Sequence, residues 1–393
     1  MTLLFANDLQ RSLLVLCVST AAILTSSLSL AQELQLTQQL EQIKANQELS
    51  RKAYHRELTT SKETAIEKYG EAATSNCDDA LRLARGAPAD PTSLDALQFV
   101  VRTARGGPTD QSAQAFALLA KYHSDAPLIG EFCVRYYWLS HFEELEQLMR
   151  QVRNDHPQKR ERACATYALG LLKMRRVNQR LKWEADDLID NHDGEELSQD
   201  LRDLDVEAAA TEAVLLFKKV CSDFGDIDFY GAPLSQDAKG KLFGVEHLRI
   251  GSVIPEISGL DHNNVSHSLS ALRGRIVVLT FSGDWCGNCK AMYPQLRKLR
   301  ADYESKGLSI ASVATDKKVD TLRQAITNKN ITWRCWWDGE DGEIVSTWGI
   351  SAFPSIFIID RAGVIRFKNL RGRQLEKAIL HLIDERSDEH ELR

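Results

Sequence analysis

The sequence predicts an α/β domain with a central mixed sheet flanked by helices over residues 249–393, preceded by an all-α helical domain over residues 32–248. Between residues 33 and 230, apolar residues recur at helical spacing without strand-like alternation. After residue 250, short β-branched runs alternate with amphipathic segments, as expected for an α/β domain. Residues 249–393 hold 21 Lys and Arg against 18 Asp and Glu, whereas the preceding residues hold 28 against 37. This difference in charge indicates that the two parts have different roles.

Residues 1–31 have the three-part pattern of a secretory signal peptide. Arg11 precedes an apolar core over residues 13–24, and small residues stand at positions −3 and −1 of a cut before Gln32. The apolar core is short for a membrane span, which needs about 20 residues. We expect cleavage and a protein exported to the periplasm or cell envelope. An uncleaved membrane anchor stays open as the alternative.

The region after this segment is expected to be a set of helices joined by short loops. Residues 33–75 contain no proline and one glycine, a composition that favours a long helix. Pro88 and the run 106–108 interrupt the helical pattern. Further amphipathic segments are expected near residues 94–105, 111–122, 128–152, 160–182 and 206–223. Such helices pair antiparallel or stack as a small solenoid.

Residues 184–207 are strongly acidic. A calcium loop is disfavoured, because with Gly194 as the turn glycine Ile189 would occupy the first ligand position, which needs a carboxylate. We expect a solvated acidic segment instead. The helical region also holds four cysteines, for which burial as free thiols is favoured and a disulfide stays open: Cys77, Cys133, Cys164 and Cys221.

The pattern of apolar residues predicts the strands and helices after residue 250. Residues 275–281 form a continuous run of β-branched and apolar residues after Arg275, as expected for a buried parallel strand. Further strands are predicted at 308–314, 332–337, 355–360 and 364–369, and helices at 290–305, 317–328 and 373–386.

Two cysteines stand where the first of these strands meets the following helix. Cys286 would lie at the helix N-terminus, where unpaired N–H groups favour a thiolate. Cys289 lies one turn later, close enough to attack a mixed disulfide on Cys286. A zinc site is disfavoured, because no second CxxC or paired-His element follows. The pattern therefore predicts a redox-active dithiol.

Two prolines agree with this prediction. Pro294 lies eight residues after Cys286, inside the helix, where it would kink the axis. Pro354 precedes the strand beginning at Ser355, and we expect the Phe353–Pro354 bond to be cis.

With these motifs, residues 249–386 resemble the TlpA/ResA branch of redoxin-like thiol–disulfide oxidoreductases, which have a thioredoxin fold. The segments that support the resemblance are 250–256, 272–279, 285–289, 348–350, 353–354 and 359–365, together with Pro294. The whole chain is more loosely similar to exported bacterial members with a helical N-terminal extension.

The resemblance implies a role for each motif residue. Cys286 would be the attacking thiolate and Cys289 the resolving thiol. Pro354 would be the cis-proline beside the pair, the Phe353 backbone would pair with an incoming chain, and Trp285 would pack against the dithiol.

Several positions depart from the family pattern. Ser282, Asn288 and Phe353 replace residues that are commonly Trp, Pro, and Thr or Val. Thr280 stands where thioredoxin has a buried Asp that accepts a proton. Its replacement is unassigned, and the candidates are Asp316, Glu340 and Asp284.

The leading hypothesis is therefore an exported enzyme that exchanges disulfides with protein substrates, without cofactor or metal. Its partners would be protein thiols and disulfides and an electron-transfer partner. A net charge of −6 gives no indication of nucleic-acid binding. A peroxiredoxin-type peroxide reductase stays open, although Gly283 stands where that family has Thr or Ser. A third alternative also stays open, namely a helical scaffold that binds a protein partner and carries a subordinate redox domain. Cys335 is expected to be buried, with a third redox thiol as the alternative.

Overall fold

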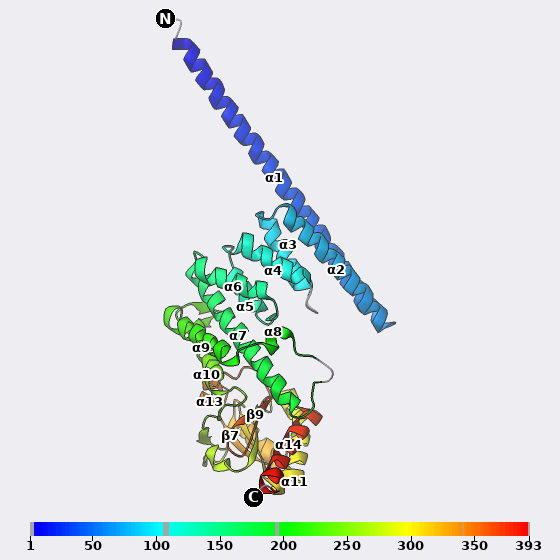
Figure 1. Ribbon diagram of the computed structural model, residues 1–393, viewed down its shortest axis with the longest axis vertical. Helices are drawn as coiled ribbons and strands as arrows, with labels where there is room; N and C mark the ends of the chain where they lie inside the picture. Colours follow the sequence, from blue (N-terminus) through cyan, green and yellow to red (C-terminus); the bar gives the residue numbers. More distant parts are fainter. Residues whose placement is uncertain (1–3, 105–109, 193–195, 341, 392–393) are drawn as a thin grey trace. The chain divides into compact units, whose positions relative to one another are not determined.

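The computed structural model describes the backbone of residues 4–104, 110–192, 196–340 and 342–391, with side chains from residue 30 to residue 385 within these ranges (Figure 1). The chain divides into two compact units. The first contains residues 1–129 and 141–156, and the second contains residues 130–140 and 157–393. The predicted boundary between residues 248 and 249 falls inside the second unit.

The first unit is built from helices that pack against their neighbours in the chain. They are α1 (Leu4–Glu57), α2 (Lys62–Gly86), α3 (Pro91–Thr103), α4 (Asp110–His123) and α6 (Glu143–Asp155). Leu97, Phe116 and Leu119 are almost fully buried between them. Helix α3 begins cleanly because Asp90 caps it, accepting a hydrogen bond from Thr92 N, and Pro91 stands in its first turn.

The expected long helix over residues 33–75 is in fact two helices, with a turn over residues 58–61. Three hydroxyl residues stand at this turn. The Thr59 hydroxyl donates to Arg56 O at 3.0 Å, and the Ser61 and Thr64 hydroxyls lie 3.0 Å apart. Such side chains compete with the backbone hydrogen bonds of a helix. The overall composition of residues 33–75 does not reveal this local effect. The turn lets α2 pack back against α1.

The second unit begins with the helices α5 (Ile129–Tyr136), α7 (Lys159–Asp187), α8 (Gln199–Arg202), α9 (Val206–Asp223) and α10 (Leu234–His247). Residues of α7, α9 and α10 form a core of their own. The expected segment over 128–152 is thus interrupted between α5 and α6. Neither α10 nor the short hairpin β1 (Asp228–Phe229) and β2 (Ala232–Pro233) was predicted.

A five-stranded mixed sheet forms the rest of the second unit, in the order β7-β6-β5-β8-β9. Its strands are β5 (Ile276–Ser282), β6 (Leu308–Ala314), β7 (Arg334–Trp337), β8 (Ser355–Ile359) and β9 (Ile365–Lys368). Strands β5, β6 and β7 are parallel, and β8 and β9 are antiparallel to their neighbours. The connecting helices are α11 (Gly287–Tyr303), α12 (Val319–Thr327), α13 (Glu343–Thr347) and α14 (Gly372–Glu391). The predicted α/β domain is confirmed, and its strand positions agree closely with those expected.

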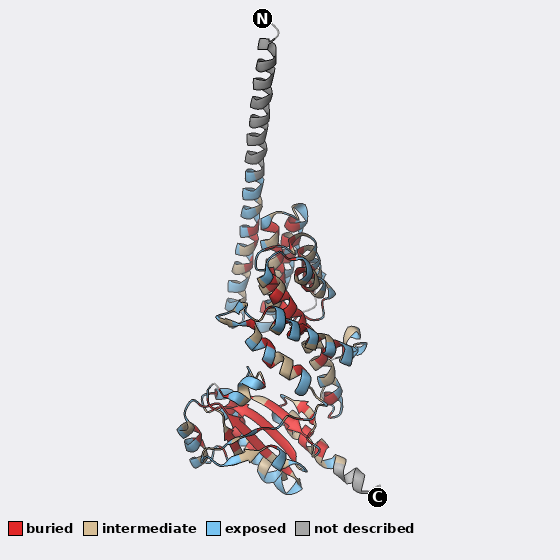
Figure 2. Ribbon diagram, turned by 90° about the vertical axis from the view of Figure 1, so that its left-hand side faces the viewer, coloured by how far each residue is buried: buried red, intermediate tan, exposed pale blue. Residues whose placement is uncertain are grey.

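The sheet is buried on both faces, as the red strands in Figure 2 show. Ile276 and Val278 of β5 face a core formed with α11 and α14. Val277 and Leu279 face a second core, which includes Leu248 from the end of α10. A further unpredicted hairpin, β3 (Ser258–Leu260) and β4 (Ser266–Ser268), precedes β5. The ends of α7 and α10 therefore pack against the five-stranded sheet domain within one unit.

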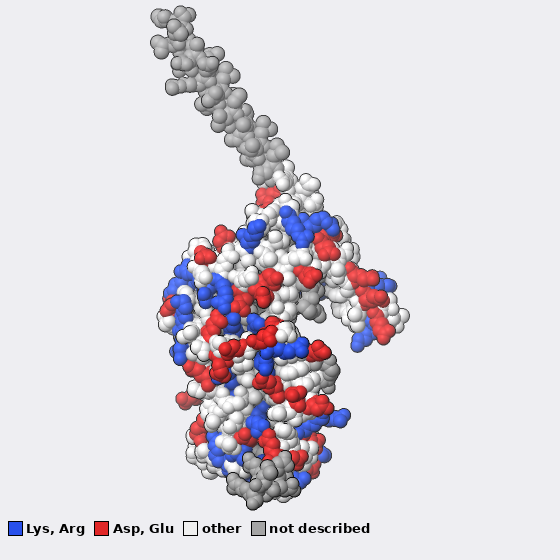
Figure 3. All heavy atoms as spheres, in the orientation of Figure 1, with Lys and Arg blue, Asp and Glu red and all other residues white. Residues whose placement is uncertain are grey.

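The predicted signal peptide lies outside the residues with described side chains, except for its last two positions. Within the part that is described, no helix is both long and apolar enough to cross a bilayer. On the face shown in Figure 3, acidic and basic side chains are interspersed over the described surface.

Candidate functional site

The site lies where the parallel strands β5 and β6 end, at the carboxyl edge of the sheet. Ser282 and Ala314 are paired at this edge. Thr315 continues beyond β6, and its backbone N–H donates to Ser282 O at 2.9 Å. The loops that leave the two strands are therefore held side by side, one leading to the cysteines and the other to Asp316.

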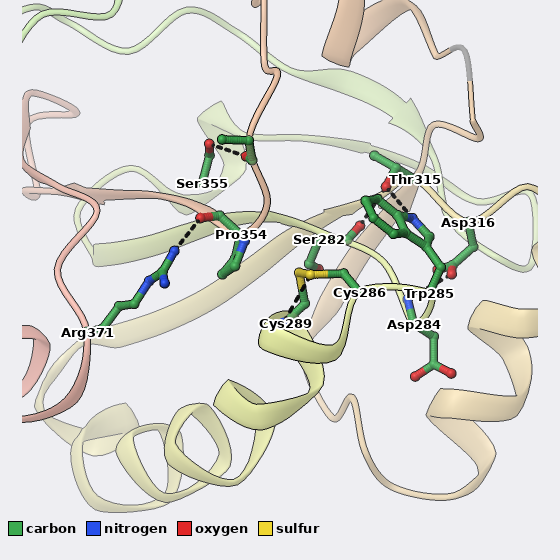
Figure 4. Close-up of a disulfide and its surroundings, with 11 residues drawn as sticks. Ser282, Asp284, Trp285, Cys286, Cys289, Thr315, Asp316, Pro354, Ser355 and Arg371 are labelled. Atoms are coloured by element: carbon green, nitrogen blue, oxygen red, sulfur yellow. Dashed lines mark hydrogen bonds between the residues drawn. A yellow bond between two sulfur atoms is a disulfide. The ribbon is translucent and has the colours of Figure 1, made fainter. Parts of the chain in front are cut away.

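The two cysteines form a disulfide at the start of α11 (Figure 4). Cys286 is the N-cap residue, with extended backbone, and its Sγ accepts from Cys289 N at 3.2 Å. Cys289 lies in the first turn, with the two Cα atoms 5.2 Å apart. Cys286 is 7% exposed and Cys289 is 1% exposed, whereas the Gly287 and Asn288 between them are exposed. Cys286 is thus the more exposed residue of the pair and lies at the positive end of the helix dipole.

A loop that ends in Pro354 faces the disulfide from the opposite side to Trp285 (Figure 4). The Phe353–Pro354 bond is cis, as predicted. Arg371 donates to Pro354 O at 3.1 Å, and the Ser355 hydroxyl donates to Ala352 O at 2.7 Å. These bonds hold the loop. Within the described part of the chain, no hydrogen bond uses the backbone N–H or carbonyl of Phe353, so both are available to an incoming strand.

Trp285 borders the disulfide with an indole that is 59% exposed. Its Nε1 donates to Thr315 Oγ1 at 3.1 Å, and its ring meets the Phe353 ring edge-on with centroids 5.2 Å apart. Gly283 lies beneath this indole, and a Cβ at that position would overlap the indole. Trp285 therefore explains why Gly283 carries no side chain.

Asp316 anchors the loop before the cysteines. Its side chain is 3% exposed, and its Oδ1 accepts from Asp284 N at 2.8 Å. Burial raises the pKa of this carboxyl, while hydrogen bonds from the backbone of Asp284 and Trp285 oppose the rise. Glu340 is exposed and forms an ion pair with Lys317 at 2.7 Å. Of the three candidate proton acceptors, Asp316 is the buried one.

At the position of the buried thioredoxin carboxylate, this chain has a neutral hydroxyl network. The Thr280 and Ser312 hydroxyls lie 2.7 Å apart, and Trp333 Nε1 donates to Ser312 Oγ at 2.7 Å. Thr280 and Ser312 are almost fully buried. Their hydroxyl groups satisfy one another, so this position needs no charge.

Cys335 lies on β7 and is 3% exposed, so its predicted burial is confirmed. Burial raises its pKa, and Asp316 adds to the rise. Cys77, Cys133 and Cys164 are also free and buried, and Cys221 is free and partly exposed. Burial raises the pKa of Cys77 and of Cys164 to about 12. Among the described cysteines, only the pair at α11 is linked.

Sequence reasoning missed three supporting residues of the site: Thr315, Ser312 and Arg371. Thr315 has a signal that could have found it, because it directly follows a predicted strand, and parallel strands meet at their carboxyl ends. Ser312 and Arg371 have none, because each acts on a residue more than ten positions away. Among the described residues, no group of His, Cys, Asp and Glu is arranged to hold a metal ion.

Residues 250–368 match the model of the AhpC/TSA family. Curated relatives include the thiol–disulfide oxidoreductase ResA of Bacillus thuringiensis subsp. konkukian, 25% identical over 134 residues. This match covers 34% of the present chain and 76% of the relative. ResA of Oceanobacillus iheyensis is 30% identical over 123 residues, which cover 30% of this chain and 62% of that one.

Among solved structures, the thioredoxin domain of a thiol–disulfide oxidoreductase from Bacteroides vulgatus is 29% identical, with a TM-score of 0.32. The match covers 34% of this chain and 97% of that one. A putative thiol:disulfide interchange protein DsbE from Chlorobium tepidum is 24% identical, with a TM-score of 0.32 and coverage of 34% and 97%. Over residues 250–368 the chain is similar to the AhpC/TSA family, and its curated relatives are thiol–disulfide oxidoreductases such as ResA.

Proposed function

We propose that this protein is an exported thiol–disulfide oxidoreductase that exchanges disulfides with protein substrates through Cys286 and Cys289. The observation that carries the proposal is the vicinal pair at the N-terminus of α11, beside a cis-proline loop. The match of residues 250–368 to the AhpC/TSA family and the similarity over 134 residues to the thiol–disulfide oxidoreductase ResA support the class of reaction.

The reaction consists of two successive displacements. In the reduced protein, the Cys286 thiolate attacks one sulfur of a substrate disulfide, and the other substrate sulfur leaves as a thiolate. The Cys289 thiolate then attacks Cys286 Sγ, breaking the mixed disulfide and releasing the second substrate thiol. Two electrons pass to the substrate while the Cys286–Cys289 bond forms. The reverse sequence oxidises a substrate dithiol, and an electron-transfer partner resets the pair.

The geometry supports these separate roles for the two sulfurs. Cys286 is the more exposed residue of the pair and caps the helix, where N–H groups stabilise a thiolate. Cys289 is buried directly behind it. Trp285 and Phe353 border the disulfide and form an apolar surface for the substrate chain. The free backbone of Phe353 is suited to pair with that chain.

Trapping of substrates tests the proposal. Full-length Cys289→Ser should accumulate covalent complexes with envelope proteins, visible as slow bands on a non-reducing gel and lost on adding dithiothreitol. Cys286→Ser is the matched control and should form none. Trapping by Cys286→Ser alone would reverse the roles. Absence of trapping together with consumption of peroxide would replace the proposal with the peroxide-reductase alternative.

We infer export from residues 1–31, whose apolar core and small-residue cut site support a signal peptide. Mass spectrometry of the native protein should find Gln32 at the N-terminus. Protein that retains residues 1–31 in the membrane fraction would instead show that the segment is an anchor. A role for the helices in binding a protein partner is compatible with either outcome.

A further inference from the structure

Trp285, the residue before Cys286, lines a groove that continues beyond the redoxin domain. A first cavity of about 620 Å³ is lined by Trp285 and Phe353 beside the cysteines. A second cavity, of about 700 Å³, is lined by Gln236 of α10 and by residues of the β1–β2 hairpin. Both cavities share the lining residues Val345 and Ile350, on and just after α13. The two cavities therefore adjoin around α13, and we call them together the α10–α13 groove.

One side of the second cavity is held in place by close packing, because α10 packs against the segment after α13. A Cβ at Gly240 would lie 2.8 Å from Gly349 Cα, so the two backbones touch. Gly349 has φ +61°, a conformation that favours glycine. Nearby, the rings of Phe243 and Trp348 lie 6.1 Å apart. These contacts fix α10 beside the redox domain, although α10 lies outside the segment that matches the family.

The lining of the groove combines apolar side chains with excess negative charge. Of the described residues that line it, Lys317 alone is basic, and it is paired with Glu340. Lys241 lies 3.8 Å from Asp237, outside the lining. The carboxyl groups that line the groove are those of Asp237, Asp284, Asp316 and Glu340. A chain with basic side chains would complement this charge.

The start of the groove can hold an extended chain. The backbone N–H and carbonyl of Phe353 have no partner within the described chain, and strand addition would satisfy them. A polypeptide paired there would place one of its cysteines beside Cys286 and send its remaining residues along the groove. In an extended strand, alternate side chains would face the apolar and acidic walls.

We propose that the α10–α13 groove binds an extended segment of the substrate protein, with basic side chains near the cysteine that Cys286 attacks. This inference rests on the proposed function and names the substrate class of the same site. The helices before the redoxin domain thereby select the substrate, because α10 and the β1–β2 hairpin supply the distal half of its binding groove.

Peptide disulfides test this inference with the reduced full-length chain. Each peptide carries one cysteine, near either end, linked to 2-nitro-5-thiobenzoate, whose release measures the single-turnover rate. The long peptides have about twelve residues and span up to about 40 Å when extended, and the short ones have about four. A basic long peptide should react about tenfold faster than both its acidic counterpart and the short peptide at low concentration, a difference of about 1.4 kcal/mol.

A bulky residue in the distal cavity should remove this preference. Gln236→Trp should bring the ratio of long-peptide to short-peptide rates close to one. Lys239→Trp, at an exposed position of α10 outside the groove lining, should keep the ratio of the wild type. Equal rates for long, short, basic and acidic peptides in the wild type would overturn the groove inference while leaving the proposed function intact. Failure to react with even the short peptide would overturn the proposed function, and this inference with it.

Discussion

Cys286 and Cys335 belong to the same domain and are almost equally buried, at 7% and 3% exposure. Cys335 lies on β7 within the core, where burial raises its pKa, and its Sγ lies 3.8 Å from Trp336 O. Cys286 instead caps α11, accepts a hydrogen bond from Cys289 N and has a second sulfur one turn away. Exposure alone therefore gives no reason to expect Cys286 to be more reactive than Cys335. The expected difference rests on the position of Cys286 at a helix N-terminus, with a partner sulfur within reach.

The largest effect on the rate of peptide-disulfide reduction should come from replacing Cys286, and replacing Cys335 is the comparison. Cys286→Ser should lower the rate of peptide-disulfide reduction by about three orders of magnitude or more, because the nucleophile is lost. Cys335→Ala should leave that rate essentially unchanged and lower the free energy of unfolding by about 1–2 kcal/mol through a small cavity. Stopped-flow rates and urea denaturation measure the two effects. A comparable loss of activity in Cys335→Ala would make Cys335 a third redox thiol.

Trp336 and Trp285 provide a second comparison between a core residue and a residue of the site. Trp336 is fully buried, and its Nε1 donates to His267 O at 3.1 Å. Trp336→Ala should therefore lower the free energy of unfolding by about 3–5 kcal/mol. Trp285 is 59% exposed, so Trp285→Ala should cost about 1 kcal/mol or less.

The KM for peptide disulfides should respond more to Trp285→Ala than to Trp336→Ala, the opposite of the order expected for stability. Trp285→Ala should raise the KM for peptide disulfides, because it removes part of the apolar border of the groove. Trp336→Ala should leave this KM unchanged at temperatures where it stays folded. Calorimetry and steady-state kinetics on both variants check the pair. A stable, fully active Trp285→Ala protein would show that this residue does not contact the substrate.

The smallest effect concerns the pH dependence of stability at Asp316. Burial raises the pKa of this carboxyl above the unfolded value of about 3.9. Between these two pKa values the folded state binds more protons than the unfolded state, so this group makes the free energy of unfolding fall as pH rises. Asp316→Asn abolishes that contribution. The stability of the wild type relative to Asp316→Asn should therefore decrease as pH rises from about 3 to 7.

Urea denaturation at several pH values measures this difference. Asp228→Asn, at an exposed position, is the matched control for replacing an aspartate by an asparagine. A wild-type advantage that stays constant or grows with pH would contradict the burial of a carboxyl with raised pKa at Asp316.

Most of the redox domain could be predicted from the sequence. The runs at residues 276–282 and 308–314 are mostly apolar, so their burial follows from local composition. The β3–β4 hairpin was missed, because its strands contain Ser, Gly and His without apolar alternation. Helix α10 was missed, because Gly240 and Gly244 weaken its helical pattern.

The parts of the site that could be predicted are local in the sequence, whereas the others join residues that lie far apart along the chain. The CxxC spacing and the proline before β8 are local patterns, so the disulfide at Cys286 and the cis bond at Pro354 could be expected. The bonds from Trp285 to Thr315 and from Arg371 to Pro354 join residues brought together only by the fold. No local pattern encodes such pairs.

Competitive alkylation of the reduced full-length chain tests the central claim most directly. A brief exposure to iodoacetamide at neutral pH, followed by peptide mapping, compares the reactivity of all the thiols in one sample. Cys286 should be modified first, while Cys335 and the buried thiols Cys77, Cys133 and Cys164 should react only after unfolding in urea. Modification of Cys335 or Cys289 at a rate equal to or above that of Cys286 in the folded protein would contradict the account.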